Sequence, residues 1–266
     1  QEAVRFWVYE YHVDGVHLSG FAPAELLASD PLLADTKLLA GSWDGVRVPK
    51  TAAAPKSRER RWHLGEYNEG FLIDMRRVLK GDEDQVGRLI YQTRRNPDAY
   101  GVINYMAATN GFTMMDMVSC EQKHNEANGE NNRDGSDYNY TWNCGVEGTT
   151  RKKKIVQMRK KQLRNAFLLL FLSQGTPMFL AGDEFGNSQN GNNNAYCQDN
   201  ETSWLNWNLN KWDQDLLAFV KHLIAFRRAH PVFHMEQEPR VMDYLACGHP
   251  DISYHGVNAW QPEFEN

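Results

Sequence analysis

The feature that most constrains the fold is an alternation of short apolar runs, polar loops and amphipathic helices along the chain. Apolar runs of strand length lie at 38–43, 102–106 and 177–182, and a polar segment follows each of them. This order is typical of a parallel sheet with helices outside it. Polar loops after the strands' carboxyl ends are also typical of barrels that carry their site on that face. The pattern therefore predicts an α/β fold.

The remaining elements follow from periodicity and from stop signals. Gly81 ends one predicted helix, Gly175 and Pro177 end another, and Pro231 ends the last. The stretch VMDYLACGHPDISYHGVNAW (241–260) predicts one or two strands of a β-type segment. We further expect strands at 11–18 and 62–67, a loop at 47–61, and helices at 22–35, 69–80, 84–94, 151–174 and 213–229. Residues 5–13 fit either a helix that leads into the first strand or a part of that strand.

Composition narrows the possible functions. With 266 residues, 41% of them hydrophobic, the chain can bury a sizeable core in one large domain, or in one domain plus a small piece. A net charge of -5 argues against a broad surface for nucleic acid or anionic membranes. The most apolar run, 167–172, is far too short to span a bilayer.

The four cysteines, Cys120, Cys144, Cys197 and Cys247, show no metal-like or CxxC spacing. We expect reduced thiols in a cytoplasmic protein, although an even count leaves disulfides open. Neither a metal site nor a cofactor is predicted.

A long segment rich in Asn, Gly, Asp and Glu follows the run at 102–106. Its amides, carboxylates and interleaved aromatic residues (Tyr138, Tyr140 and Trp142) can hydrogen-bond to a polyhydroxylated ligand and stack on it. Composition alone favours a solvated loop over a binding segment, but a loop this long is usually functional or disordered.

Three uninterrupted stretches resemble a known family: KHNEANGENNRDGSDYNYTWNCGVEG (123–148), RKKQLRNAFLLLFLSQGTPMFLAGDEFG (159–186) and GNNNAYCQDNETSWLNW (191–207). They are similar to the isoamylase and glycogen-debranching branch of glycoside hydrolase family 13. The resemblance implies barrel strands four to eight in residues 1–232, and the start of a small C-terminal β domain in 233–266. Since five strands alone leave open edges, we expect a fragment of a longer protein or a half-barrel completed by a partner.

The same resemblance places the family's three catalytic carboxylates. DGVHLS (14–19) stands where the family has DGFRFD, which puts Ser19 at the nucleophile position and His17 at its arginine companion. The acid/base position falls on Gly41, in AGSWD (40–44). The third acid falls on Asn110, and its histidine neighbour on Thr109. None of the three carboxylates is present, although retaining glycosidases need two of them.

The resemblance also implies substrate-binding residues: His17, Trp43, Thr109, Asn110, His124, Asn125, Glu130, Arg133 and Asp134. Alternatives exist for several of them. Trp43 could equally be a core residue, and Glu130, Arg133 and Asp134 could connect the loop through salt bridges. Turn chemistry explains Asn192, Asn193, Asn194 and Asp199 as well as a cleft does.

Three functions remain open. The first is a catalytically silent protein that binds an α-glucan such as glycogen, starch or branched maltodextrin. The second is an active hydrolase of α-1,6 branches that has recruited another acid, such as Asp14, Glu25, Asp44, Asp116 or Glu184. The third is a structural or regulatory subunit that docks a partner at the open barrel edge.

Overall fold

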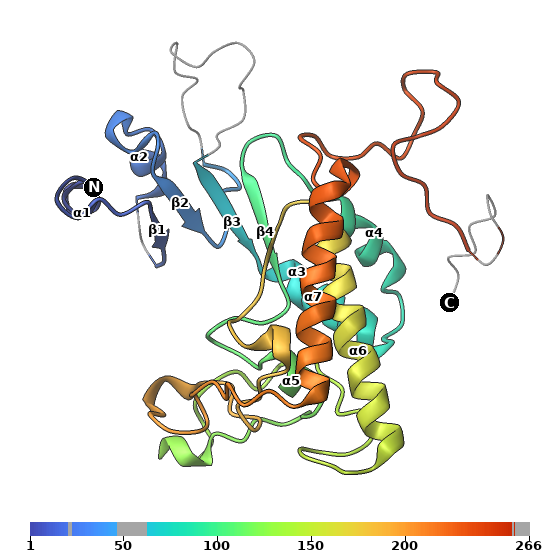
Figure 1. Ribbon diagram of the computed structural model, residues 1–266. Helices are drawn as coiled ribbons and strands as arrows, with labels where there is room; N and C mark the ends of the chain where they lie inside the picture. The colour runs from blue at the N-terminus through green and yellow to red at the C-terminus, as the bar shows by residue number, and fades with distance from the viewer. Residues whose placement is uncertain (21–22, 47–62, 257, 259–266) are drawn as a thin grey trace.

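A five-stranded parallel sheet, in the order β1-β2-β3-β4-β5, forms the centre of the molecule (Figure 1). The computed structural model describes residues 1–20, 23–46, 63–256 and 258. Strand order equals sequence order, with helices in the connections, as in a segment of a β/α barrel. The predicted α/β class and the five strands are confirmed. The strands are β1 (Gly15–Leu18), β2 (Lys37–Ala40), β3 (Leu64–Asn68), β4 (Gly101–Tyr105) and β5 (Thr176–Met178).

The longer helices lie close to their predicted positions. The helices are α1 (Glu2–Tyr11), α2 (Ala24–Ala28), α3 (Glu69–Lys80), α4 (Val86–Arg94), α5 (Met114–Met117), α6 (Lys153–Leu172) and α7 (Lys211–Ala229). Helices α3 and α7 have strong local start signals. The Asn68 side chain accepts the Phe71 amide at the start of α3, and Asn210 forms a capping box with Asp213 at the start of α7.

One face of the sheet is covered by helices, and the other is half open. Leu38, Leu64 and Val102 are buried on the covered face. Tyr67 and Tyr105 lie on the opposite face and are only partly buried. In a closed barrel that opposite face points into the interior. In the described residues it is only partly covered.

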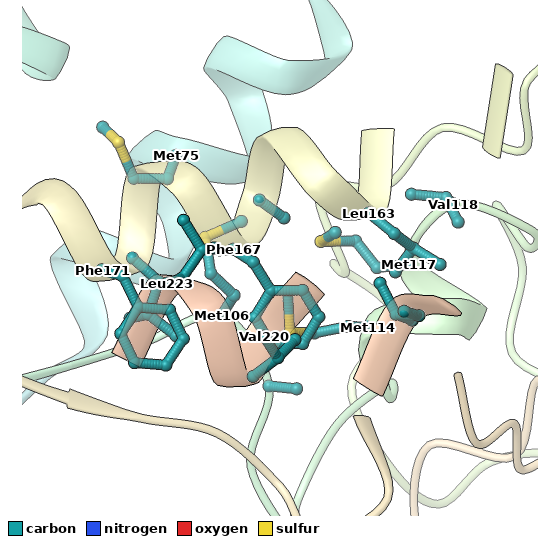
Figure 2. Close-up of a cluster of buried hydrophobic side chains, with 14 of the residues drawn as sticks. Met75, Met106, Met114, Met117, Val118, Leu163, Phe167, Phe171, Val220 and Leu223 are labelled. Carbon is teal, nitrogen blue, oxygen red and sulfur yellow. The ribbon is translucent and has the colours of Figure 1, made fainter. Parts of the chain in front are cut away.

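The main core lies between the helices and the polar loops. Phe167 and Phe171 on α6 pack with Val220 and Leu223 on α7, and methionines from α3, α5 and the β4 end fill the space between them (Figure 2). A second cluster, around Leu38, Leu64 and Trp43, anchors α1 and α2 to the β1 side of the sheet. The first core therefore fixes the long loops that follow β4 and β5.

Two expectations differ from the structure, and a third is not tested by it. The strand predicted at 11–18 is a helix up to Tyr11 and a strand only from Gly15, because Val4 and Val8, one turn apart, pack against the second cluster. The helix predicted at 22–35 is two short pieces, α2 and a 3₁₀ turn at Pro31–Leu33, separated by Asp30, which caps the Leu32 amide. The loop predicted at 47–61 lies outside the described residues.

The end of the chain contains no strand among residues 234–256 and 258. The ion pair Arg240–Asp251, at 2.7 Å, closes a loop within this segment, and the ion pair Arg94–Glu238, at 2.8 Å, attaches the segment to α4. The β domain predicted from 233 onward therefore stays a prediction. Among the helices of the described residues, none combines the length and apolarity that a membrane span requires.

Candidate functional site

Two of the three singled-out catalytic positions meet at the carboxyl edge of the sheet. Leu18 of β1 is in register with Ala40 of β2, so Ser19 and Gly41 leave neighbouring strands at the same level. Adjacent strands lie about 4.8 Å apart, so side chains at these positions are close neighbours. Both residues are exposed, and a Cβ atom at Gly41 would meet nothing within 4 Å. The edge therefore has room for a larger side chain.

The third position, Asn110, is carried by the loop after β4, together with Thr109. Both residues are exposed. Arg76 of α3 anchors this loop. It donates hydrogen bonds to the carbonyls of Met106, before Thr109, and of Phe112, after Asn110. Arg76 is 3% exposed, and burial lowers its pKa to about 10. Sequence reasoning missed this anchor, because a single arginine in an amphipathic helix resembles a solvated residue.

Aromatic rings line the open face of the sheet towards the same edge. The His17 and Tyr67 ring centroids are 4.7 Å apart, and those of Tyr67 and Tyr105 are 6.1 Å apart. His17 was predicted as a binding residue, whereas Tyr67 and Tyr105 were missed. The signal was available, since period-2 alternation in β3 and β4 places both tyrosines on the face away from the buried residues.

Trp43 occupies the core rather than the surface. It is 3% exposed, and its indole N–H donates to the Gly65 carbonyl at 2.9 Å. A side chain buried in this way offers no ring face to a ligand, so the core alternative for Trp43 fits the structure.

Asn125 and Asp134 form the centre of a hydrogen-bond network that joins the two polar loops. Asn125 is fully buried, accepts the Asn193 amide at 3.0 Å and donates to Asn193 Oδ1 at 2.9 Å. Asp134 accepts the side-chain amides of Asn128 and Asn194. These hydrogen bonds hold the pKa of Asp134 below its usual range. The network connects the loops through amides, and among the described residues no salt bridge joins Glu130, Arg133 and Asp134.

The remaining predicted binding residues, Glu130, Arg133 and His124, differ in how exposed they are. Glu130 and Arg133 are exposed, and the Arg133 Nε donates to the Glu130 carbonyl. His124 is half-buried and forms a hydrogen bond of 2.9 Å with Glu147. The structure thus leaves Glu130 and Arg133 accessible, while Asn125 and Asp134 shape the loop.

Similar proteins give the chain its family. No protein-family model matches it. It is 39% identical over 256 residues to the glycogen operon protein GlgX homolog of Mycobacterium tuberculosis, covering 87% of this chain and 34% of that protein. It is 38% identical to the glycogen debranching enzyme of Erwinia tasmaniensis, covering 89% and 38%, and 31% identical to rice isoamylase 1, covering 85% and 33%.

The chain belongs to the isoamylase and glycogen-debranching group of glycoside hydrolase family 13. It spans about a third of the length of the curated relatives that it matches. A pullulanase of Paenibacillus barengoltzii, in complex with maltohexaose and alpha-cyclodextrin, shares the fold at a TM-score of 0.59 and 21% identity, over 89% of this chain and 37% of that one. The barrel-segment interpretation is thereby confirmed for this isoamylase-type chain.

Most acids that could replace the missing carboxylates in this isoamylase-type chain are poorly placed. Asp14 precedes β1 and so lies at the opposite edge of the sheet. Asp116 is 1% exposed and bonded to Ser188 and to the Gln189 amide. Glu184 accepts the Gly182 amide behind β5. Two acids are exceptions, and both are exposed: Asp44 follows β2, and Glu25 lies on α2, the helix after β1.

Asp44 already has a partner. The Tyr100 hydroxyl donates to its Oδ1 at 2.7 Å, and burial together with this bond raises the pKa of Tyr100. A glycosidase needs two carboxyl groups, and Asp14, Asp116 and Glu184 do not supply a second one beside Asp44 at this edge.

Proposed function

We propose that the protein acts in α-glucan metabolism as a debranching-type glucan-binding protein that does not hydrolyse its ligand. The observation that carries this proposal is the carboxyl edge of the sheet, where Ser19 and Gly41 lie side by side and neither supplies a carboxylate. Retaining glycosidases need two carboxyl groups about 5 Å apart, which is the spacing of neighbouring strands. The two neighbouring strand ends are present, but the two carboxyl groups that hydrolysis requires are absent.

The residues at the three catalytic positions cannot take over the roles of the missing carboxyl groups. A serine hydroxyl needs a paired base to become a nucleophile. A glycine has no proton to donate. Asn110 can donate and accept hydrogen bonds to a sugar but stays neutral, so it cannot stabilise a cationic transition state as a carboxylate does.

Support for glucan binding comes from the aromatic side chains near the edge and on the loops. His17, Tyr67 and Tyr105 form a row along the open face. Tyr138, Tyr196 and Trp207 are 80%, 69% and 73% exposed on the polar loops. Exposed rings beside amides are the groups that stack on sugar faces and hydrogen-bond to hydroxyls. The relatives named for glycogen debranching favour a branched glucan as the ligand.

An active α-1,6 hydrolase remains the second candidate, and Asp44 is the observation in its favour. It predicts that Asp44→Asn abolishes all hydrolysis. The third candidate, a regulatory subunit, is favoured by the half-open sheet face, with the missing part of the barrel or another subunit as its partner. It predicts a mass in size-exclusion chromatography above that of a monomer. A cytoplasmic location accompanies all three as a prediction.

Co-sedimentation with glycogen tests binding, and a triple variant tests the cleft. The purified protein should sediment with glycogen and release no reducing ends. Ser19→Asp, Gly41→Glu and Asn110→Asp together should then gain branch cleavage, since a side chain at Gly41 has free space. Failure to sediment with glycogen contradicts the binding proposal. A folded triple variant that binds but stays inactive contradicts an intact cleft.

A further inference from the structure

Three side chains that commonly bind transition metals meet outside the carboxyl edge. Cys120 follows α5, His124 comes four residues later, and Glu147 lies in the turn before α6. One potential ligand atom from each lies within 4.8 Å of the other two. Sequence spacing gave no hint of the group, because the third ligand comes 23 residues after the second.

The local backbone brings these side chains together. The His124 amide donates to the Gly191 carbonyl at 2.7 Å. Gly191 has a positive φ of 80°, and a Cβ atom there would lie 2.6 Å from the His124 ring and 3.0 Å from the Cys120 sulfur. The absence of a side chain at Gly191 lets the imidazole and the thiol approach the same point.

The Glu147 carboxylate is held in place by several donors. The Glu121 amide donates to it at 2.9 Å and the Asn143 side-chain amide at 3.1 Å. These hydrogen bonds are the outer contacts that orient a ligating carboxylate in metal sites. His124 Nε2 lies 2.9 Å from Glu147 Oε1, so these two ligand atoms already point toward each other.

The group borders a cavity of about 540 Å³. Cys120 and His124 form part of its wall, together with Arg159, Trp212 and Asp116, and none of Ser19, Gly41 and Asn110 does. The Nε atom of Arg159 and the indole nitrogen of Trp212 are buried without a hydrogen-bond partner. The cavity thus leaves space for a fourth, exchangeable ligand on a metal.

We propose that Cys120, His124 and Glu147 form a zinc-type metal site with an open fourth position on this cavity. Thiolate, imidazole and carboxylate are the ligands that zinc takes in proteins, and three protein ligands plus one open position is a common arrangement. Zinc bonds of about 2.0–2.3 Å place tetrahedral ligand atoms about 3.3–3.6 Å apart. Ligand atoms that already lie within 4.8 Å reach this geometry through small side-chain rotations.

The charge of the surroundings favours a cation. A bound thiolate and Glu147 contribute two negative charges, and Asp116 borders the same cavity. Arg159 and Lys160 are the opposing positive charges in the cavity wall. The Arg159 guanidinium is directed to the carbonyls of Gly148 and Asn143, and the Lys160 ammonium lies over the Trp212 ring. Without metal, the His124–Glu147 hydrogen bond is an ordinary loop contact that does not involve Cys120. A metal site therefore requires Cys120 as a ligand, whereas a loop contact between His124 and Glu147 does not.

Cobalt(II) is the probe, because a Co²⁺–thiolate bond gives a near-ultraviolet charge-transfer absorption. The metal-stripped, fully reduced protein should bind one Co²⁺ with this absorption, and zinc should displace it. Cys120→Ser should lose the absorption, whereas Cys144→Ser, also a buried cysteine, should keep it. His124→Gln should weaken zinc binding by more than the roughly 10–100-fold that loss of an outer partner causes.

Two results of the cobalt titration would overturn the proposal, and the first needs only the unaltered protein. Absence of the charge-transfer absorption at saturating cobalt contradicts thiolate ligation, whatever the variants do. An absorption that persists in Cys120→Ser, or disappears in Cys144→Ser, assigns the metal to other cysteines and also overturns the site. Circular dichroism of each variant separates loss of a ligand from loss of the fold.

Discussion

Replacing Asn125 by alanine tests whether the loop network or a ligand explains this residue. The side chain is fully buried and makes both an accepted and a donated hydrogen bond with Asn193. Alanine leaves the Asn193 amide and its Oδ1 atom without these partners. An unsatisfied buried polar group costs about 1–3 kcal/mol, so two of them cost roughly 2–6 kcal/mol.

The effect should appear first as local opening of the two loops. Native-state hydrogen exchange of the Asn193 amide reports this opening directly. A loss of about 3 kcal/mol corresponds to an exchange rate roughly 100-fold faster. Asn125→Asp should cost at least as much above its carboxyl pKa, because an oxygen replaces the donor that faces Asn193 Oδ1.

The matched control is Glu130→Gln in the same loop, where the side chain is exposed. It should change stability by no more than about 0.5 kcal/mol. If Asn125→Ala leaves the exchange of the Asn193 amide unchanged while weakening glycogen binding, the residue contacts ligand and the network account is refuted.

Three further perturbations follow from buried groups. Burial raises the pKa of Asp183 to about 7, against 3.8 for an ordinary aspartate, so the folded protein holds a proton that the unfolded chain has lost between these values. The free energy of unfolding should therefore fall as pH rises from 4 to 7, by up to about 1.4 kcal/mol per pH unit, and denaturation of Asp183→Asn should lack this component. Trp43→Phe should cost about 1–3 kcal/mol, through the lost bond to Gly65, and leave glycogen co-sedimentation unchanged; a tenfold weaker binding at unchanged stability would contradict the core assignment. Arg76→Lys should cost about 2–4 kcal/mol in urea unfolding, because lysine cannot reach all of its carbonyl partners, whereas Arg77→Lys on the same helix should be nearly neutral.

The periodic parts of the fold could be predicted from sequence. Helix α3 occupies the predicted range 69–80 and ends at the Gly81 signal, because the groups that set its ends, Gly81 and the Asn68 cap, are local. At the start of the chain the sequence left helix and strand both open, since the aromatic residues there favour a strand. Helix α1 is stabilised by contacts with distant residues, namely the packing of Val4 and Val8 on the second cluster and the Arg5–Asp30 ion pair.

The candidate site was predictable where it depends on strand ends. Ser19 and Gly41 follow two strands whose order determines their neighbourhood. The buried network around Asn125 was not predictable, because its partners lie 68 residues away and a run of asparagines looks alike whether buried or exposed. The approach of Glu147 to Cys120 and His124 depends on the same long-range folding of loops.

Release of reducing ends from glycogen by the purified, unaltered protein tests the central claim most directly. The claim is that an isoamylase-type cleft without carboxylates at Ser19, Gly41 and Asn110 binds glucan but does not cleave it. We predict no release above that of a heat-denatured sample, under conditions in which the protein sediments with glycogen. Release that exceeds this background and disappears in Asp44→Asn would contradict the claim and identify an active hydrolase.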